Sequence, residues 1–282
     1  MVRLKEISKE EYYYDIASMS REEMEKFLKK SNRDWKKAVK NSKISGYMKD
    51  MILNEKVRGK LAMLLEKELK IPKTAKVLDI GAGMGALTLA LARKFNVSAT
   101  DANLLSLKFV KQRAEQEKVK LKLYKTSPLH KGLPFKKSSF DVVIMNGVLE
   151  WVAYGFEYKK SAKNIQESVL KNIFQILRKD GIFVLAIENR VALDWFRGKT
   201  SHMPVKYIDL LPRKLADVLC RIKLKQPFRT YIYTKYGYKK LLKNAGFRSI
   251  DFYEAQPNYQ KPKLITKSKN LLANSYIIIS KK

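Results

Sequence analysis

The chain has 282 residues, of which 45% are hydrophobic, so it can bury the core of one large domain and is not an intrinsically disordered polypeptide. Its single cysteine, Cys220, excludes an intramolecular disulfide. Cysteine and histidine residues nowhere show the spacing of a zinc site, so the sequence predicts no metal. No stretch has the length and apolarity of a signal peptide core or a membrane span, which favours a cytoplasmic protein.

The net charge of +32 is unusual, and residues 196–282 contribute half of it. A surface of this kind attracts a polyanion such as RNA, an acidic membrane surface or a phosphorylated substrate. A lysine-rich composition with solvated faces explains the same count, because the lysines are scattered and form no compact basic block. The charge therefore keeps RNA open as a partner without requiring it.

Residues 1–70 are predicted to form helices, which we interpret as an N-terminal helical cap. Ser20 is followed three positions later by Glu23, the pattern of a capping box at a helix start. Leucines recur at helical spacing between residues 57 and 70, and Pro72 then prevents the helix from continuing. A second unit, the main domain, is expected over residues 71–282.

From Lys76 onward, short apolar runs alternate with helical periods, which predicts a doubly wound α/β sheet. The predicted strands cover residues 76–80, 97–101, 121–125, 140–145, 181–188, 248–254 and 274–280. The predicted helices between them cover residues 85–95, 103–118 and 162–178, and a last helix ends at Gly246. Residues 190–230 contain three prolines and no clean period, so we expect an insertion or lid before the last helix. The fold class is thus α/β, with a seven-stranded Rossmann-like sheet.

The strongest local signal is VLDIGAGMGALTLALA over residues 77–92, in which Gly81, Gly83 and Gly85 join an apolar strand to an apolar helix. Such a loop lets backbone approach a ligand and directs a helix N-terminus at it. These glycines also satisfy the pattern of a dinucleotide site. Asp79 separates the two interpretations, because a carboxylate here repels a pyrophosphate but attracts the cationic methionyl group of S-adenosylmethionine.

A second carboxylate, Asp101, closes the next predicted strand, 16 residues after Gly85. A carboxylate at this position accepts hydrogen bonds from both ribose hydroxyls of a nucleotide. The alternative is that Asp101 caps the helix that follows. Ala82 and Ala102, which adjoin these residues, complete the predicted set of cofactor contacts in this region.

Three further motifs follow in order: LPF at 133–135, SFDVVI at 139–144 and ILRKDG at 176–181. Together with the glycine loop and Asp101, this ordered set resembles the class I (Rossmann-like) S-adenosylmethionine-dependent methyltransferase superfamily. The resemblance implies a Rossmann-like fold, S-adenosylmethionine as cofactor and methyl transfer as the reaction.

In that superfamily the residues after the third strand cup the adenine, and those after the fourth line the methionyl end of the cofactor. The first position is occupied here by a stretch around Ser127, which lacks the acidic residue often found there. Asn146 and Gly147 occupy the second position. The resemblance implies that Ser127 or backbone contacts the adenine, whereas Asn146 and Gly147 either line the methionyl group or form a plain turn.

The loop after the fifth strand, AIENRVALDWFRGKTSHMP, is a candidate substrate wall, because ligands bind at the carboxyl ends of strands in such sheets. With the later TYIYTKYGYKKLLKNAGF, it resembles methyltransferases of cell-surface polysaccharide biosynthesis, which implies a carbohydrate-type acceptor methylated at a hydroxyl. Methyl transfer to a hydroxyl needs a base. His202 is the first candidate, with Glu150 and Glu188 as alternatives, although His202 could be a surface loop residue and residues 188–190 a structural network.

Two other functions stay open. An RNA methyltransferase fits the net charge of +32, but the sequence has neither an Asn-Pro-Pro-Tyr nor a Pro-Cys motif. A noncatalytic nucleic-acid-binding protein could keep the same fold, since fold alone does not establish turnover. The intact glycine loop with both carboxylates argues against that second alternative.

Overall fold

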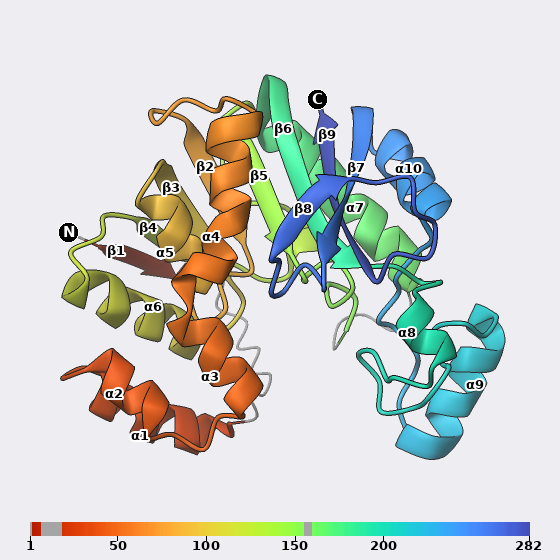
Figure 1. The fold of residues 1–282 in the computed structure, drawn as a ribbon, viewed down its shortest axis with the longest axis horizontal. Coiled ribbons are helices and arrows are strands. Elements are labelled where there is room, and N and C mark those ends of the chain that lie inside the picture. Colours follow the sequence, from red (N-terminus) through yellow and green to blue (C-terminus); the bar gives the residue numbers. More distant parts are fainter. Residues whose placement is uncertain (1, 7–18, 155–159) are drawn as a thin grey trace.

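A computed structural model describes residues 2–6, 19–154 and 160–282. It contains a nine-stranded sheet in the order β1-β4-β3-β2-β5-β6-β9-β7-β8, covered by helices on both faces (Figure 1). Residues 7–18 of the predicted helical cap lie outside the described residues. The division of the chain at residue 70 stays a prediction.

The strands are β1 (Arg3–Glu6), β2 (Lys76–Ile80), β3 (Asn96–Asp101), β4 (Lys122–Lys125), β5 (Phe140–Asn146), β6 (Leu177–Glu188), β7 (Arg248–Gln256), β8 (Leu264–Lys267) and β9 (Ser275–Lys281). The N-terminal helices are α1 (Arg21–Ser31), α2 (Trp35–Lys40), α3 (Gly46–Leu53) and α4 (Glu55–Met63), which a π-helical turn at Leu64–Glu68 extends. The later helices are α5 (Ala86–Ala92), α6 (Leu104–Gln116), α7 (Ala162–Ile176), α8 (Leu193–Phe196), α9 (Arg213–Leu224) and α10 (Lys235–Asn244), and a short 3₁₀ turn covers Leu129–Lys131.

Seven of the nine strands form the predicted doubly wound sheet. Strands β4, β3, β2, β5 and β6 are parallel, and β9 lies antiparallel between β6 and β7. Helices cover both faces, so the inner strands are buried on both sides and their sequences are nearly continuous apolar runs. The parallel strands all end at one edge of the sheet, which is where ligands bind in such folds.

Two edge strands were not predicted. The expectation that residues 1–70 are helical is wrong for Arg3–Glu6, which pair in parallel with β4 as β1. The side chains of Val2 and Leu4, two positions apart, both pack on the apolar cluster around α6, and this spacing of two is typical of a strand. At the opposite edge of the sheet, β8 pairs antiparallel with β7.

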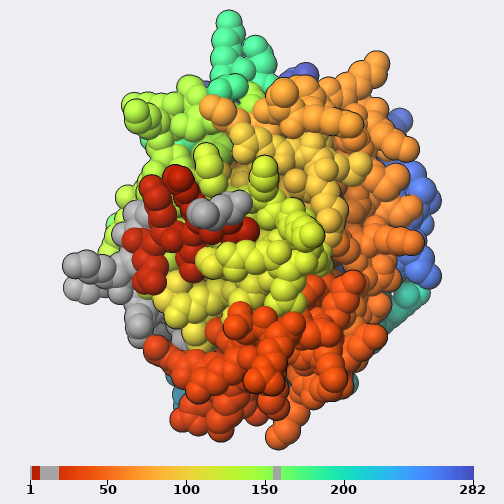
Figure 2. All heavy atoms as spheres, turned by 90° about the vertical axis from the view of Figure 1, so that its left-hand side faces the viewer, coloured from red at the N-terminus to blue at the C-terminus, as the bar shows by residue number. Residues whose placement is uncertain are grey.

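The N-terminal helices are fixed to the sheet through α6, and Figure 2 shows the two side by side on one face of the molecule. The predicted capping box is present, with the Ser20 side chain accepting from the Glu23 N–H at the start of α1. In α6 the Arg113 side chain is buried and donates to the backbone oxygens of Ile52, at 3.1 Å, and Met84, at 3.5 Å. Arg113 thus connects α3 to the glycine loop.

The predicted insertion over residues 190–230 contains α8 and α9, and both lie beyond the same end of the sheet as α1–α3 (Figure 1). The helix α9 was not predicted. Its outer side carries the exposed apolar residues Leu215, Val218 and Ile222, while Ala216 and Cys220 are buried on the inner side. Leu215, Val218 and Ile222 stand at the i, i+3 and i+7 spacing of a helix, so the sequence contained this signal, which was overlooked between Pro212 and Pro227.

The insertion is tied to the end of β6 by the residues that follow Glu188. The Arg190 guanidinium donates to the backbone oxygens of Asp209, at 2.8 Å, and Leu211, at 2.9 Å. The Asn189 side chain donates to two backbone oxygens of the segment before β9. The structural interpretation is therefore confirmed for Arg190, whereas the Asn189 side chain binds the segment before β9 and not the insertion. Among the described residues, no helix has the length and apolarity to cross a membrane, and the cytoplasmic location stays a prediction.

Candidate functional site

The glycine loop joins β2 to α5 at the carboxyl edge of the sheet. Its three glycines, Gly81, Gly83 and Gly85, have φ angles of +86°, +51° and +78°, a region that side chains rarely adopt. The N–H groups of Gly81 and Ala82 donate to the Thr100 oxygen at 2.8 and 3.0 Å, which fixes the loop against β3. A Cβ atom on Gly81 would lie 2.2 Å from Cγ2 of Val148. The loop therefore packs directly on the segment that follows β5.

Asp101 holds this loop in place from the end of β3. Its Oδ2 accepts from the Gly83 N–H at 2.8 Å, and its Oδ1 accepts from the Asn103 N–H at 2.9 Å. The cap of α6 is Asn103, whose side chain accepts from the N–H groups of Leu105 and Ser106. The alternative that Asp101 caps this helix is therefore wrong, and its carboxylate stands at the glycine loop.

Asp79 is buried at the end of β2, where its Oδ2 accepts from the Thr88 hydroxyl at 2.6 Å. Burial, together with the Asp101 charge, raises the pKa of Asp79 to about 6, although the Thr88 hydrogen bond and the Arg58 charge oppose the shift. The ionised form of Asp79 is therefore not fully stabilised by the positive charges and hydrogen-bond donors around it. A cationic ligand beside Asp79 would supply that compensation.

At pH values below about 6, the affinity for S-adenosylmethionine is expected to decrease, because protonated Asp79 does not attract the cationic methionyl group. Linkage predicts that the dissociation constant rises about tenfold for each pH unit below that value. Calorimetric titrations from about pH 5 to about pH 8 measure this dependence. An affinity that stays constant over the whole range contradicts the role given to Asp79.

The other predicted cofactor residues also lie at the carboxyl edge. Ser127 comes two residues after β4, and Ala102 follows Asp101 directly. Asn146 ends β5, and its Oδ1 is buried without a hydrogen-bond partner. Gly147 has a φ angle of +68°, and its N–H donates to the Ala186 oxygen at 2.8 Å. Sequence reasoning thus selected residues that the fold brings to one edge.

Tyr259 and Arg58 were not selected from the sequence. A Cβ atom on Gly147 would lie 2.5 Å from the Tyr259 hydroxyl, which also donates to Oε1 of Glu188 at 3.0 Å. Arg58 in α4 donates to the Met51 sulfur at 3.2 Å, and its Nε is buried without a hydrogen-bond partner. Burial lowers the pKa of Arg58, while the charges of Tyr259, Tyr47 and Asp79 oppose that shift. Neither residue belongs to a local motif, so only the fold reveals its place.

The three candidate bases Glu150, Glu188 and His202 meet in one cluster. Nε2 of His202 lies 3.4 Å from Oε2 of Glu188 and 3.8 Å from Oε1 of Glu150. The side chain of Glu150 is 0% exposed, that of His202 10% and that of Glu188 13%. This burial contradicts the alternative that His202 is a surface loop residue.

Each member of the cluster comes from a different segment, and each is held by its own contacts. Glu150 lies in the turn after β5, which Gln166 fixes by donating to the Leu149 oxygen at 3.0 Å. Glu188 is the last residue of β6, and His202 lies in the insertion between α8 and α9. The ring of Trp151 packs edge-on against that of His202, with 4.9 Å between centroids. The cluster therefore adjoins the glycine loop through residues 147–150.

The charges in the cluster depend on one another. Burial, together with the Glu188 carboxylate, raises the pKa of Glu150 well above its ordinary value. Burial works to lower the pKa of His202, but the Glu188 and Glu150 carboxylates raise it to about 9. Burial works to raise the pKa of Glu188, yet His202 and Tyr259 lower it overall. At neutral pH the cluster therefore holds a protonated His202, an ionised Glu188 and a neutral Glu150.

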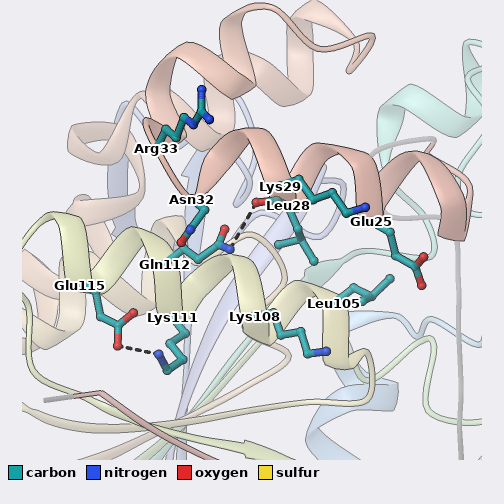
Figure 3. Close-up of a pocket in the computed structure, with 10 residues that line it drawn as sticks. All are labelled: Glu25, Leu28, Lys29, Asn32, Arg33, Leu105, Lys108, Lys111, Gln112 and Glu115. Carbon is teal, nitrogen blue, oxygen red and sulfur yellow. Dashed lines mark hydrogen bonds and ion pairs between the residues drawn. The ribbon is translucent and has the colours of Figure 1, made fainter.

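A separate groove lies between α1 and α6, away from all of these residues (Figure 3). Lys111 and Glu115 pair within it, and Gln112 donates to the Leu28 oxygen across it. The groove is lined by Glu25, Leu28, Lys29, Asn32, Arg33, Leu105, Lys108, Lys111, Gln112 and Glu115. None of the predicted cofactor or base residues contributes to it.

The sheet order and the glycine loop at its carboxyl edge are those of the Rossmann-like fold of class I methyltransferases. Residues 78–185 match the family model described as a methyltransferase domain, so the chain carries a domain of this family. A methyltransferase domain over these residues supports S-adenosylmethionine as the cofactor, in agreement with the expectation from the sequence. A comparison with curated proteins gave no significant match.

Solved structures support the fold. A methyltransferase of Thermotoga maritima, described as a possible histamine N-methyltransferase, has a TM-score of 0.52 at 15% identity, over 93% of this chain and 100% of its own. A methyltransferase of Methanosarcina mazei has a TM-score of 0.50 at 18% identity, and the match covers 76% of this chain and 95% of its own. Phosphoethanolamine N-methyltransferase 2 of Haemonchus contortus, solved with S-adenosyl-L-methionine, has a TM-score of 0.52 at 14% identity. The match covers 79% of this chain and 52% of that protein's chain. At these identities the likeness shows the fold and not the acceptor.

Proposed function

We propose that this chain transfers the methyl group of S-adenosylmethionine to a hydroxyl of a carbohydrate-type acceptor. The observation that carries the proposal is the buried cluster of Glu150, Glu188 and His202 beside the glycine loop. The acceptor oxygen forms its bond to the methyl carbon as the sulfur–methyl bond breaks, and the electron pair stays on sulfur to give S-adenosylhomocysteine. The hydroxyl proton passes to Glu188, the member of the cluster that is ionised at neutral pH, and protonated His202 holds that carboxylate in place.

The residues at the carboxyl edge suit the separate parts of the cofactor. Asp79 suits the ammonium group of the methionyl part, and Arg58, whose Nε lacks a partner, suits its carboxylate. Asp101 suits the ribose hydroxyls and Ser127 the adenine. Asn146 and Gly147, between Tyr259 and the glycine loop, suit the end that carries the reacting methyl group. With the cofactor held in this way, its methyl group would face the cluster.

Trp151 supports a carbohydrate acceptor. It is 39% exposed although large and apolar, and its ring adjoins His202. An aromatic surface beside polar groups suits a sugar ring, which has an apolar face and hydroxyls at its edge. The acceptor would therefore lie on Trp151 with one hydroxyl at the cluster.

Transfer of a labelled methyl group from S-adenosylmethionine to a panel of oligosaccharides and RNAs tests the proposal. We expect labelled saccharide and a loss of turnover of at least about 100-fold in His202→Ala, with the affinity for S-adenosylmethionine retained. Glu254→Gln, which changes a carboxylate that bonds to Ser268 and Asn270 and to no member of the cluster, provides the control and should keep full turnover. Saccharide labelling that His202→Ala leaves unchanged contradicts the role of the cluster.

The net charge of +32 supports RNA as the second candidate acceptor. Phosphate contacts release counterions, so RNA binding would weaken steeply with salt. Labelled RNA together with unlabelled saccharides would identify an RNA methyltransferase. Salt-sensitive RNA binding without labelling of any acceptor would favour a noncatalytic nucleic-acid-binding protein.

A further inference from the structure

The cluster of Glu150, Glu188 and His202 has a feature that a base alone does not require: its polar atoms converge at ion-pair distances without a direct hydrogen bond between them. One ligand-type atom from each residue lies within 4.8 Å of the other two. Both carboxylate oxygens of Glu150, Oε2 of Glu188 and Nε2 of His202 are buried and make no hydrogen bond. Buried polar atoms normally have partners, so these four atoms suit a ligand that binds them together.

The two separations from His202 are close to those between neighbouring ligand atoms around a metal ion. Bonds of about 2.0–2.2 Å to nitrogen and oxygen, at tetrahedral or octahedral angles, place neighbouring ligand atoms about 3.0–3.5 Å apart. The 3.4 Å between His202 and Glu188 falls in this range, and the 3.8 Å between His202 and Glu150 lies just beyond it. We propose that Glu150, Glu188 and His202 bind one divalent transition-metal ion, contrary to the expectation from the sequence that no metal is present.

The chemistry of the three side chains selects the class of cation. Two carboxylates and an imidazole suit ions such as Mn²⁺, Fe²⁺ and Zn²⁺, whereas Mg²⁺ and Ca²⁺ prefer oxygen ligands alone. Two carboxylates balance the charge of a divalent ion, so a neutral imidazole completes the set without excess charge. The site therefore favours a transition metal over Mg²⁺.

The surroundings orient the three ligands. The Tyr259 hydroxyl donates a hydrogen bond to Oε1 of Glu188 at 3.0 Å. The other oxygen of this carboxylate, Oε2, faces His202. The Tyr238 hydroxyl donates to the backbone oxygen of Glu188 at 2.9 Å and fixes the end of β6. The Trp151 ring restricts the imidazole of His202. Supporting contacts of this kind are typical of metal sites, where they fix ligand direction.

Three protein ligands leave coordination positions for an acceptor, as in catalytic metal sites. The role of the ion rests on the proposed function: an acceptor hydroxyl on the cation loses its proton more readily, and the proton passes to water. The acceptor oxygen then forms its bond to the methyl carbon while the sulfur–methyl bond breaks. His202 and both glutamates would act as ligands, and the ion would replace the base. Binding of the cation itself needs neither cofactor nor acceptor.

Titration of the full chain with MnCl₂ and with ZnCl₂, after removal of bound metal by a chelator, tests the site. We expect one ion per chain, a rise in Tm on addition of Mn²⁺ and weaker binding of Mg²⁺. Glu150→Gln keeps the side-chain shape and should weaken Mn²⁺ binding at least about 100-fold. Glu188→Gln should do the same, and Glu254→Gln should bind as the unchanged chain does.

Absence of stoichiometric binding of either ion overturns the proposal, and so does binding that both Glu150→Gln and Glu188→Gln leave unchanged. The Tm of each variant without metal shows whether it is folded, so lost binding is not confused with unfolding. The two failures are distinguishable: a chain that binds Mn²⁺ at this cluster yet methylates no acceptor supports the metal site and contradicts the proposed function.

Discussion

Asp79→Asn is expected to weaken the binding of S-adenosylmethionine by at least about 100-fold, because it removes a buried carboxylate from beside the cationic methionyl group. Asparagine has nearly the same shape and still offers an oxygen to the Thr88 hydroxyl. The loss would therefore reflect charge and not packing. Calorimetric titration measures it, and Asp251→Asn, an exposed carboxylate at a distance from the site, provides the matched control.

The same substitution should not destabilise the chain in the absence of cofactor. The pKa of Asp79 is raised from 3.8 to about 6 by burial, so its ionised form is disfavoured in the folded state. That destabilisation is absent below the unfolded pKa, grows as the pH rises toward 6 and is complete above it. Asparagine removes it, so the free energy of unfolding at pH 7 should stay constant or rise by up to about 3 kcal/mol. An affinity for S-adenosylmethionine within about twofold of the unchanged chain contradicts the cofactor assignment.

Gly81→Ala is expected to lower the free energy of unfolding by about 2–5 kcal/mol and to abolish cofactor binding. A side chain at its φ of +86° costs about 1–2 kcal/mol. The new Cβ would lie 2.2 Å from Cγ2 of Val148, and such overpacking adds about 1–3 kcal/mol. Denaturant unfolding and calorimetric titration measure the two effects.

Two further variants separate these causes. Gly59→Ala in α4 places a Cβ 3.9 Å from that of Ala90, an ordinary contact, and should raise stability by about 0.5–1 kcal/mol. Combining Gly81→Ala with Val148→Ala removes the clash and leaves the backbone strain, so it should recover part of the loss. If Gly81→Ala proves as stable as Gly59→Ala, the described packing of the glycine loop is wrong.

The cofactor site could be predicted from the sequence because its parts are local. Each predicted residue stands at the end of a strand or in the loop that follows it, and strand ends in a parallel sheet meet at one edge. Apolar runs gave the strands to within a few residues, and Asp79 and Asp101 followed from their positions at two strand ends. The edge strand β1 was missed because its apolar period covers only Val2 and Leu4, too short a pattern to compete with a helical interpretation.

The arrangement of the candidate base residues could not be predicted, because it depends on contacts between distant segments. Glu150, Glu188 and His202 were selected singly, but nothing in the spacing of the three places them within 4.8 Å of one another. Their convergence requires the insertion to fold back over β6, which Arg190 secures by bonding to backbone oxygens. Tyr259 and Arg58 were missed for the same reason, since their neighbours lie far away in the chain.

Calorimetric titration of the purified chain with S-adenosylmethionine and, separately, with NAD tests the central claim most directly. We expect one S-adenosylmethionine to bind per chain with a micromolar dissociation constant, which corresponds to a binding free energy on the order of −8 kcal/mol, and we expect no binding of NAD. Binding of NAD without S-adenosylmethionine would contradict it, because the glycine loop would then accept a pyrophosphate beside the Asp79 carboxylate.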